Sequence, residues 1–140
     1  MIPLRRRRLA GLLALLATVV AGLLVHLGLP ASTLTDVAGD ALYTVAVYAG
    51  LVVLFPALPP RVVAVLAGAW SVAVELFQAT GIPFELARRF PPIALVLGTG
   101  FDARDLVVYV MAALAAWAID VTVVRRATQR RTVPDRSISR

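Results

Sequence analysis

Several residue types are missing or scarce in this sequence of 140 residues, and each shortage excludes something. Cysteine is absent, so the protein has no disulfide framework, no thiol nucleophile and no thiolate metal site. Histidine occurs once, as His26, and no nucleophile elbow is present, which argues against a serine hydrolase. Lysine is also absent, so all 14 basic residues are arginines.

Charge of either sign is scarce as well. Charged residues make up 16% of the chain and hydrophobic residues 60%. A water-soluble globule of this size cannot bury so much apolar surface. The apolar residues come in blocks of roughly 17 to 21, about the length that a helix needs to cross the hydrocarbon of a bilayer. The composition therefore predicts an all-α integral membrane protein.

The apolar blocks predict a bundle of four transmembrane helices. The first block follows an arginine run, but it is longer than the apolar core of a signal peptide and no cleavage pattern follows it. We therefore expect a retained helix. Proline closes the first two blocks, at Pro30 and Pro56, because it cannot continue a helix. The predicted helices cover residues 9–29, 38–58, 62–80 and 105–124.

Two segments outside these helices have a different character. Residues 81–104 join the third and fourth helices, and their longest apolar run, Ile93 to Leu97, is too short to span a membrane. The pattern predicts an interfacial or re-entrant segment. Residues 125–140 are rich in arginine and polar side chains, which indicates a disordered basic tail after a single transmembrane domain of residues 1–124.

The arginines also indicate an orientation. Most of them flank the two termini or the turn between the second and third helices, and only Arg88, Arg89 and Arg104 fall in the loops on the other side. Because cytoplasmic loops carry an excess of basic residues, both termini are predicted to be cytoplasmic. Arginines next to a membrane meet lipid first, so we expect membrane lipids and no nucleic acid as partners.

Polar residues gather near the outer ends of the predicted helices. On the third helix, Ser71, Glu75 and Gln78 lie on one face because they are spaced four and three apart. Asp40 opens the second helix and Asp105 opens the fourth, so similar depths are expected. The cluster predicted from these positions, with one arginine of the following loop, consists of Asp40, Tyr43, Glu75, Gln78, Arg88, Asp105 and Tyr109.

Glu75 is the member of this set that costs most to place in a membrane. A lone carboxylate at the centre of a bilayer costs roughly 2.5 to 3.5 kcal/mol on insertion scales, and less toward the interface. Glu75 must therefore be paired, hydrogen-bonded, hydrated or protonated. Arg88 or Arg89 is the predicted partner, since a guanidinium holds a carboxylate through two parallel bonds.

Other acidic residues favour simpler interpretations. Asp120 lies near the inner face beside Arg125 and Arg126, which predicts a solvated or salt-bridged helix end. Carboxylates such as Asp102 and Asp105 suit hard cations, but they lack a recognised ligand spacing. We therefore predict neither a metal site nor a cofactor.

Four stretches resemble a known family when they are taken in order: "GDALYTVAVY", "SVAVELFQ", "LARRF" and "LVLGTGFDARDLVVY". Over residues 35–115 they resemble a small bacterial membrane family known as domain of unknown function 2809, which is itself similar to the VanZ-like proteins. The residues that match the family pattern are Gly39, Asp40, Tyr43, Glu75, Gln78, Arg88, Leu97, Gly98, Asp105 and Leu106. The family commonly has Trp-Ser before the last Asp, whereas this chain has Ala103 and Arg104.

The resemblance implies a bacterial cytoplasmic membrane protein but supplies no reaction. Some family members carry a ribosomal-maturation label, which four spans without a basic helix and interleaved aromatics do not support. The VanZ-like relatives are linked with glycopeptide resistance and the cell envelope. An envelope role is what this resemblance implies.

Three hypotheses about function follow. The leading one is that the outer polar cluster binds a lipid headgroup or a ligand resembling a wall precursor. The second is a membrane hydrolase or transferase that uses Glu75 or Asp105 as general base. The third is a scaffold whose polar residues only lock the bundle. A transporter is disfavoured, because four helices without a visible repeat are few for alternating access unless the protein forms a homo-oligomer.

Overall fold

The computed structural model describes residues 4–98 and 100–129, and this part of the chain is helical. Its elements are α1 (Leu4–Gly28), α2 (Thr33–Leu54), α3 (Pro60–Gln78), α4 (Ile82–Arg89), the 3-10 turn η1 (Pro91–Ile93), α5 (Ala94–Leu97) and α6 (Ala103–Gln129). Four of them, α1, α2, α3 and α6, are long and apolar enough to cross a membrane. The prediction of an all-α protein with four membrane-spanning helices is confirmed at this level.

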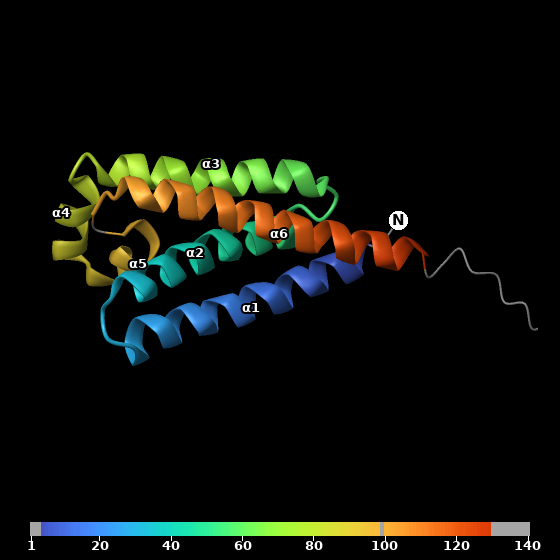
Figure 1. Ribbon diagram of the computed structural model, residues 1–140, viewed down its shortest axis with the longest axis horizontal. Helices are drawn as coiled ribbons and strands as arrows, with labels where there is room; N and C mark the ends of the chain where they lie inside the picture. Colours follow the sequence, from blue (N-terminus) through green and yellow to red (C-terminus); the bar gives the residue numbers. More distant parts are fainter. Residues whose placement is uncertain (1–3, 99, 130–140) are drawn as a thin grey trace, which may run out of the picture.

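The four long helices form an antiparallel bundle (Figure 1). α1 packs against α2, while α2, α3 and α6 pack against one another. The beginning of α1, the α2–α3 turn and the end of α6 lie at one end, which we call the arginine end. α4 and α5 lie at the opposite end, which we call the carboxylate end. Both described chain ends therefore lie on the same side of the bundle.

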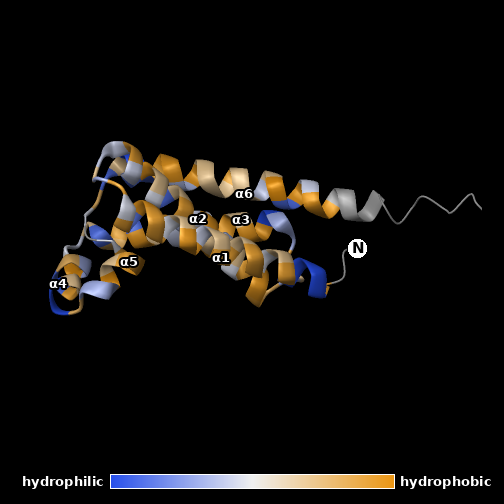
Figure 2. Ribbon diagram, turned by 90° about the horizontal axis from the view of Figure 1, so that it is seen from below, coloured by the Kyte–Doolittle hydropathy of each residue, from blue (hydrophilic) through white to orange (hydrophobic). Residues whose placement is uncertain are grey.

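Figure 2 shows how hydropathy follows this architecture, with apolar colours along the helices and hydrophilic colours at the start of α1 and around α4. Large apolar side chains such as Leu13 and Val65 point outward and are 60% and 69% exposed. The buried core consists of smaller groups, and a Cβ on Gly11 would lie only 2.9 Å from Val52 Cγ1. Such close helix contacts are typical of membrane bundles, where packing replaces the hydrophobic effect between helices.

The second helix begins and ends earlier than predicted. The helix was predicted to begin at residue 38, but α2 begins at Thr33. Ser32 and Thr35 form a capping box, in which Thr35 N donates to Ser32 Oγ and Ser32 N donates to Thr35 Oγ1. These bonds satisfy two backbone groups at the helix start. The helix ends at Leu54 because Pro56 disfavours helical backbone at the residue before it.

The first and last long helices, α1 and α6, are longer than predicted. α1 begins at Leu4 and so includes the arginine run, which was expected to precede the helix. α6 continues to Gln129, because residues 125–129 are mostly good helix formers. The rest of the predicted disordered tail, residues 130–140, lies outside the described residues. The third helix, Pro60–Gln78, agrees closely with its prediction and starts with proline at its first turn.

The segment between α3 and α6 covers the carboxylate end with two short helices and one 3-10 turn (Figure 1). After α5 the chain reverses at Gly98, whose φ of +66° is a conformation that favours glycine. A Cβ there would lie 2.5 Å from Gln78 Nε2, so the Gln78 amide lies directly against this turn. The turn feeds into the beginning of α6. An interfacial or re-entrant position for this segment stays a prediction.

Candidate functional site

The centre of the carboxylate end is Glu75 on α3, which has no exposed surface. Its Oε1 accepts a hydrogen bond of 2.6 Å from the backbone N–H of Asp102, just before α6. Its Oε2 accepts a hydrogen bond of 2.9 Å from the hydroxyl of Tyr109 on α6. Both oxygens are therefore bonded, and one side chain fastens α3 to α6 and to the loop that precedes α6.

Asp40 and Asp105 lie beside this pair. The Tyr109 hydroxyl is 3.5 Å from Asp40 Oδ1, and the carboxyl groups of Asp40 and Asp105 are close enough to interact. A single hydroxyl hydrogen cannot serve both Asp40 and Glu75. The hydroxyl hydrogen therefore goes to Glu75, which is closer, and Asp40 Oδ1 has only a long contact with Tyr109. We call Asp40, Glu75, Asp105 and Tyr109 the carboxylate cluster.

Arg104 is the basic side chain that reaches this cluster. Its Nε lies 3.6 Å from Asp105 Oδ1, which is an ion pair but is too long for a hydrogen bond. Its Nη2 lies 3.2 Å from Asp102 Oδ2. Asp105 is 8% exposed, and its Oδ1 is buried without a hydrogen-bond partner. Among the described residues, Arg104 thus pairs with the carboxyl groups of Asp102 and Asp105, while those of Asp40 and Glu75 have no ion pair.

The other predicted site residues lie at the same end but outside the carboxylate cluster. Tyr43 is half-buried, and its hydroxyl accepts a hydrogen bond of 3.0 Å from Trp70 Nε1. Gln78 lies against Gly98. Arg88 is exposed and makes a long ion pair of 3.5 Å with Glu85, one turn away on α4.

The predicted partner of Glu75 was therefore wrong. Arg88 contacts Glu85, Arg89 is exposed, and Glu75 is satisfied by the Asp102 backbone and the Tyr109 hydroxyl instead. The reason is geometric. α4 leads the chain away from the end of α3, whereas the loop that returns from α5 brings Asp102 back over Glu75.

A hollow of about 520 Å³ lies at the same end of the bundle, and no member of the carboxylate cluster lines it. It is bordered by the end of α3 and by α4, through Thr80, Gly81, Ile82, Phe84, Glu85, Leu86 and Arg89. The exposure around the cluster is greatest at half-buried Asp40 and exposed Asp102. Within the described ranges, no group of three His, Cys, Asp or Glu residues could hold a metal ion.

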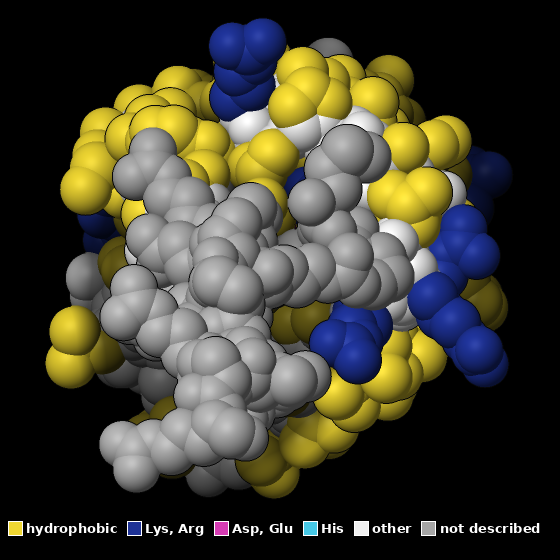
Figure 3. Space-filling model, turned by 90° about the vertical axis from the view of Figure 1, so that its right-hand side faces the viewer, with side chains coloured by type: hydrophobic (Ala, Val, Ile, Leu, Met, Phe, Trp, Pro, Cys, Tyr) yellow, Lys and Arg dark blue, Asp and Glu magenta, His cyan; other side chains and the backbone are white. Residues whose placement is uncertain are grey.

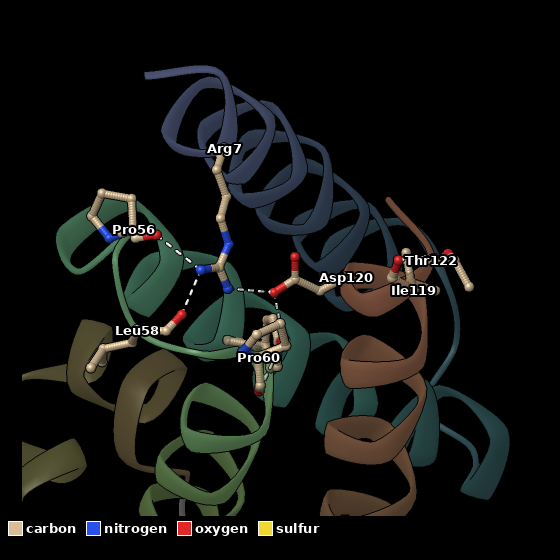
Figure 4. Close-up of polar contacts among 8 residues, drawn as sticks. Arg7, Pro56, Leu58, Pro60, Ile119, Asp120 and Thr122 are labelled. Atoms are coloured by element: carbon tan, nitrogen blue, oxygen red, sulfur yellow. Dashed lines mark hydrogen bonds and ion pairs between the residues drawn. The ribbon is translucent and has the colours of Figure 1, made fainter. Parts of the chain in front are cut away.

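A second polar cluster, at the arginine end, was not predicted (Figure 4). Arg7 of α1 donates from Nη2 to Asp120 Oδ2 over 2.7 Å, and the Tyr48 hydroxyl donates to the same oxygen over 2.9 Å. Arg7 Nη1 donates to the carbonyl oxygens of Pro56 and Leu58, at 2.9 and 2.5 Å. We call Arg7, Tyr48 and Asp120, together with these carbonyls, the arginine clasp.

The arginine clasp bears out a salt-bridged helix end for Asp120. The partner is Arg7, which comes from the other end of the chain. The side chains of Arg7 and Asp120 are only 10% and 12% exposed. Nothing in the sequence separates Arg7 from its three arginine neighbours, because the choice depends on how α1 packs against α2.

Proline explains why arginines are drawn to the α2–α3 turn. Pro56, Pro59 and Pro60 have no N–H groups, so this turn offers fewer donors than acceptors. Arg7 bonds two of its carbonyls, and Arg8 Nε donates to Val53 O over 3.0 Å in the last turn of α2. Unpaired carbonyls are costly in or near hydrocarbon. The arginines of α1 therefore cap the end of the neighbouring helix.

Between the two clusters, a buried hydrogen bond joins α2 to α3 in the middle of the bundle. Thr44 Oγ1 on α2 and Ser71 Oγ on α3 are 3.1 Å apart, and both residues have no exposed surface. Asp40, Thr44 and Tyr48 are spaced four residues apart and share one face of α2. That face thus carries a polar contact to α3 or α6 at three successive turns.

Comparison with protein families identifies a family for this chain. The model of the family described as "Protein of unknown function (DUF2809)" matches residues 29–113, more than half of the chain. The chain belongs to this family. The match includes every member of the carboxylate cluster, whereas Arg7 and Asp120 of the arginine clasp lie outside it. No curated protein and no solved structure matches the chain. The likeness to VanZ-like proteins and the envelope role stay predictions.

Proposed function

We propose that this DUF2809 protein uses its carboxylate cluster to bind the cationic group of a zwitterionic ligand, such as the ammonium group of a lipid headgroup or of a wall precursor. The observation that carries the proposal is unmatched charge: among the described residues, Arg104 pairs with Asp102 and Asp105, while the neighbouring carboxyl groups of Asp40 and Glu75 have no ion pair. Uncompensated carboxylates near hydrocarbon are costly. A bound cation offsets that cost.

In this proposal the side chains of the site have different roles. Asp40 is half-buried, so it is the carboxylate that contacts the cation. Asp105 Oδ1 is buried and has lone pairs that no hydrogen bond uses, so Asp105 attracts the cation through its charge. Glu75 has no exposed surface, so it orients Tyr109 and does not touch the ligand. Arg104 is 44% exposed at the same place, where a guanidinium suits the phosphate of a zwitterion.

Lipid-dependent thermal unfolding of the purified protein in a non-ionic detergent tests the proposal. Phosphatidylethanolamine should raise the midpoint more than phosphatidylcholine does, because both are zwitterionic but only the former has an ammonium group with N–H donors. A ligand present at 100 times its dissociation constant stabilises by about 2.7 kcal/mol. Soluble phosphoethanolamine and an amine-bearing stem peptide distinguish a lipid from a wall precursor as the source of the cation.

Variants complete this experiment. Asp105→Asn and Asp40→Asn should remove the difference between the two lipids, whereas Asp36→Asn should preserve it. Asp36 is a matched control because it is exposed in the first turn of the same helix, α2. Equal responses to the two lipids, or a full response from Asp105→Asn, would contradict the proposal.

A structural lock is the second candidate, and the burial of Glu75 favours it. Glu75 has no exposed surface, and both of its oxygens accept hydrogen bonds that hold α3 to α6 and to the preceding loop. The same burial argues against Glu75 as a general base, since a substrate could not reach it. If the lock is the whole function, substitution of Glu75 lowers stability while no headgroup or amine shifts the unfolding midpoint.

A further inference from the structure

The arginine end presents an exposed surface of one charge. Arg5, Arg6 and Arg61 are exposed there. Asp120 is the acidic residue of this end in the described part of the chain, and Arg7 covers it. Figure 3 shows this end with basic side chains around it and no acidic side chain in view. The surface therefore has a net positive charge that nothing described within the protein offsets.

The four consecutive arginines of α1 do not play the same part. Arg7 is turned inward into the arginine clasp, and Arg8 donates to the end of α2. Arg5 and Arg6 have no hydrogen bond or ion pair with other described residues, and the same holds for Arg61 at the start of α3. Two arginines of the run are thus engaged in the fold, and two remain available.

We propose that Arg5, Arg6 and Arg61 form a binding surface for the headgroups of anionic phospholipids, and that Arg7 and Arg8 take no part in it. Leu4 and Leu9 lie beside the free arginines on α1 and are 50% and 55% exposed. A partner for this surface must offer anionic oxygens and hydrocarbon side by side. An anionic phospholipid offers both, and its attraction to juxtamembrane basic residues is well established. This inference is independent of the carboxylate cluster.

The test uses the full chain in nanodiscs of phosphatidylcholine with increasing fractions of phosphatidylglycerol, with native mass spectrometry to count the phosphatidylglycerol that the released protein retains. Neutralising Arg5, Arg6 and Arg61 together to Gln should weaken retention about fivefold for each arginine. A higher salt concentration should also reduce the phosphatidylglycerol that the wild type retains, because salt screens the attraction between arginine and headgroup.

A control keeps the proposal open to refutation. Arg8→Gln should leave the preference for phosphatidylglycerol at the wild-type value. The proposal is overturned if the triple variant retains phosphatidylglycerol like the wild type. It is also overturned if Arg8→Gln loses retention as strongly as the triple variant does.

Discussion

The two ends of the bundle handle charge in opposite ways. At the arginine end, one guanidinium meets one carboxylate, a tyrosine hydroxyl and two backbone carbonyls, and the pair is balanced. At the carboxylate end, one partly exposed arginine pairs with Asp102 and Asp105, while Asp40 and Glu75 have no ion pair. Each end leaves one buried side-chain atom without a hydrogen bond, Arg7 Nε at one and Asp105 Oδ1 at the other. The difference therefore lies in charge: the arginine clasp is neutral, whereas the carboxylate cluster has negative charge that the fold does not offset.

This difference assigns different roles to the two ends. The arginine clasp joins α1 to α6 and to the α2–α3 turn. Two of its three side chains, Arg7 and Asp120, lie outside the region that the family model matches. The carboxylate cluster lies entirely inside that region. We therefore expect stability to depend mainly on the first and ligand binding on the second.

The largest expected effect comes from breaking the arginine clasp. Arg7→Gln should lower the free energy of unfolding in detergent by about 3 kcal/mol, because it leaves the buried Asp120 carboxylate without its cation. Arg5→Gln is the matched control on the same helix and should change stability by less than about 0.5 kcal/mol.

A charge exchange sharpens that result. Arg7→Asp combined with Asp120→Arg should recover only part of the loss, because an aspartate at position 7 cannot donate to the carbonyls of Pro56 and Leu58. Full recovery would show that the ion pair alone matters. No loss in the single variant would show that the clasp does not hold the bundle.

The next effect concerns the buried member of the carboxylate cluster. Glu75→Leu should cost about 2 to 3 kcal/mol in thermal unfolding, because the Asp102 N–H and the Tyr109 hydroxyl lose their acceptors. Glu75→Gln should cost about 1 kcal/mol, since its amide oxygen still accepts one of these bonds. Glu85→Gln on exposed α4 serves as the control. Equal stability of the Leu and Gln variants would count against the role of Glu75 as an acceptor.

A smaller effect is expected at the turn above Glu75. Gly98→Ala should cost about 1 to 2 kcal/mol, because alanine is strained at a φ of +66° and its Cβ would meet the Gln78 amide. The same substitution at Gly100, which has open space around its Cα, is the control. Adding Gln78→Ala should relieve the contact but not the backbone strain. If Gly98→Ala and Gly100→Ala unfold at the same temperature, the turn does not constrain the site.

The smallest effect is expected between the two ends. A double-mutant cycle of Thr44→Val and Ser71→Ala should give a coupling of about 0.6 kcal/mol, the average of measured hydrogen bonds between membrane helices. Unfolding in mixed micelles measures it. A coupling of several kcal/mol would mean that the middle of the bundle, rather than its ends, holds the helices together.

Helical spacing explains why much of the carboxylate cluster could be predicted. Glu75 and Gln78 share one face of a helix, and Asp40, Asp105 and Tyr109 lie in the first halves of helices that start at the same end, so an antiparallel bundle gathers them. The partner of Glu75 could not be predicted, because it is a backbone N–H that a turning loop brings back. Side-chain charge gives no signal for such a donor.

The arginine clasp could not be predicted for a related reason. Its ion pair joins α1 to α6, and every arginine in the run from Arg5 to Arg8 is an equal candidate in the sequence. Only the rotation of α1 against α2, set by close contacts such as that of Gly11 with Val52, turns Arg7 inward. The predicted helix bounds were wrong where local hydrogen bonds set the end of a helix, as the Ser32 capping box does for α2.

The clasp also has a consequence for the order of assembly. During synthesis the N-terminal helices of a chain emerge first, so α1 and the α2–α3 turn meet before Asp120 has been made. Until then Arg7 has only carbonyl oxygens and water as partners. Arrival of α6 supplies the carboxylate and closes the contact between the first long helix and the last. The ion pair therefore forms only when all four long helices are present, and a chain cut short before Asp120 cannot complete it.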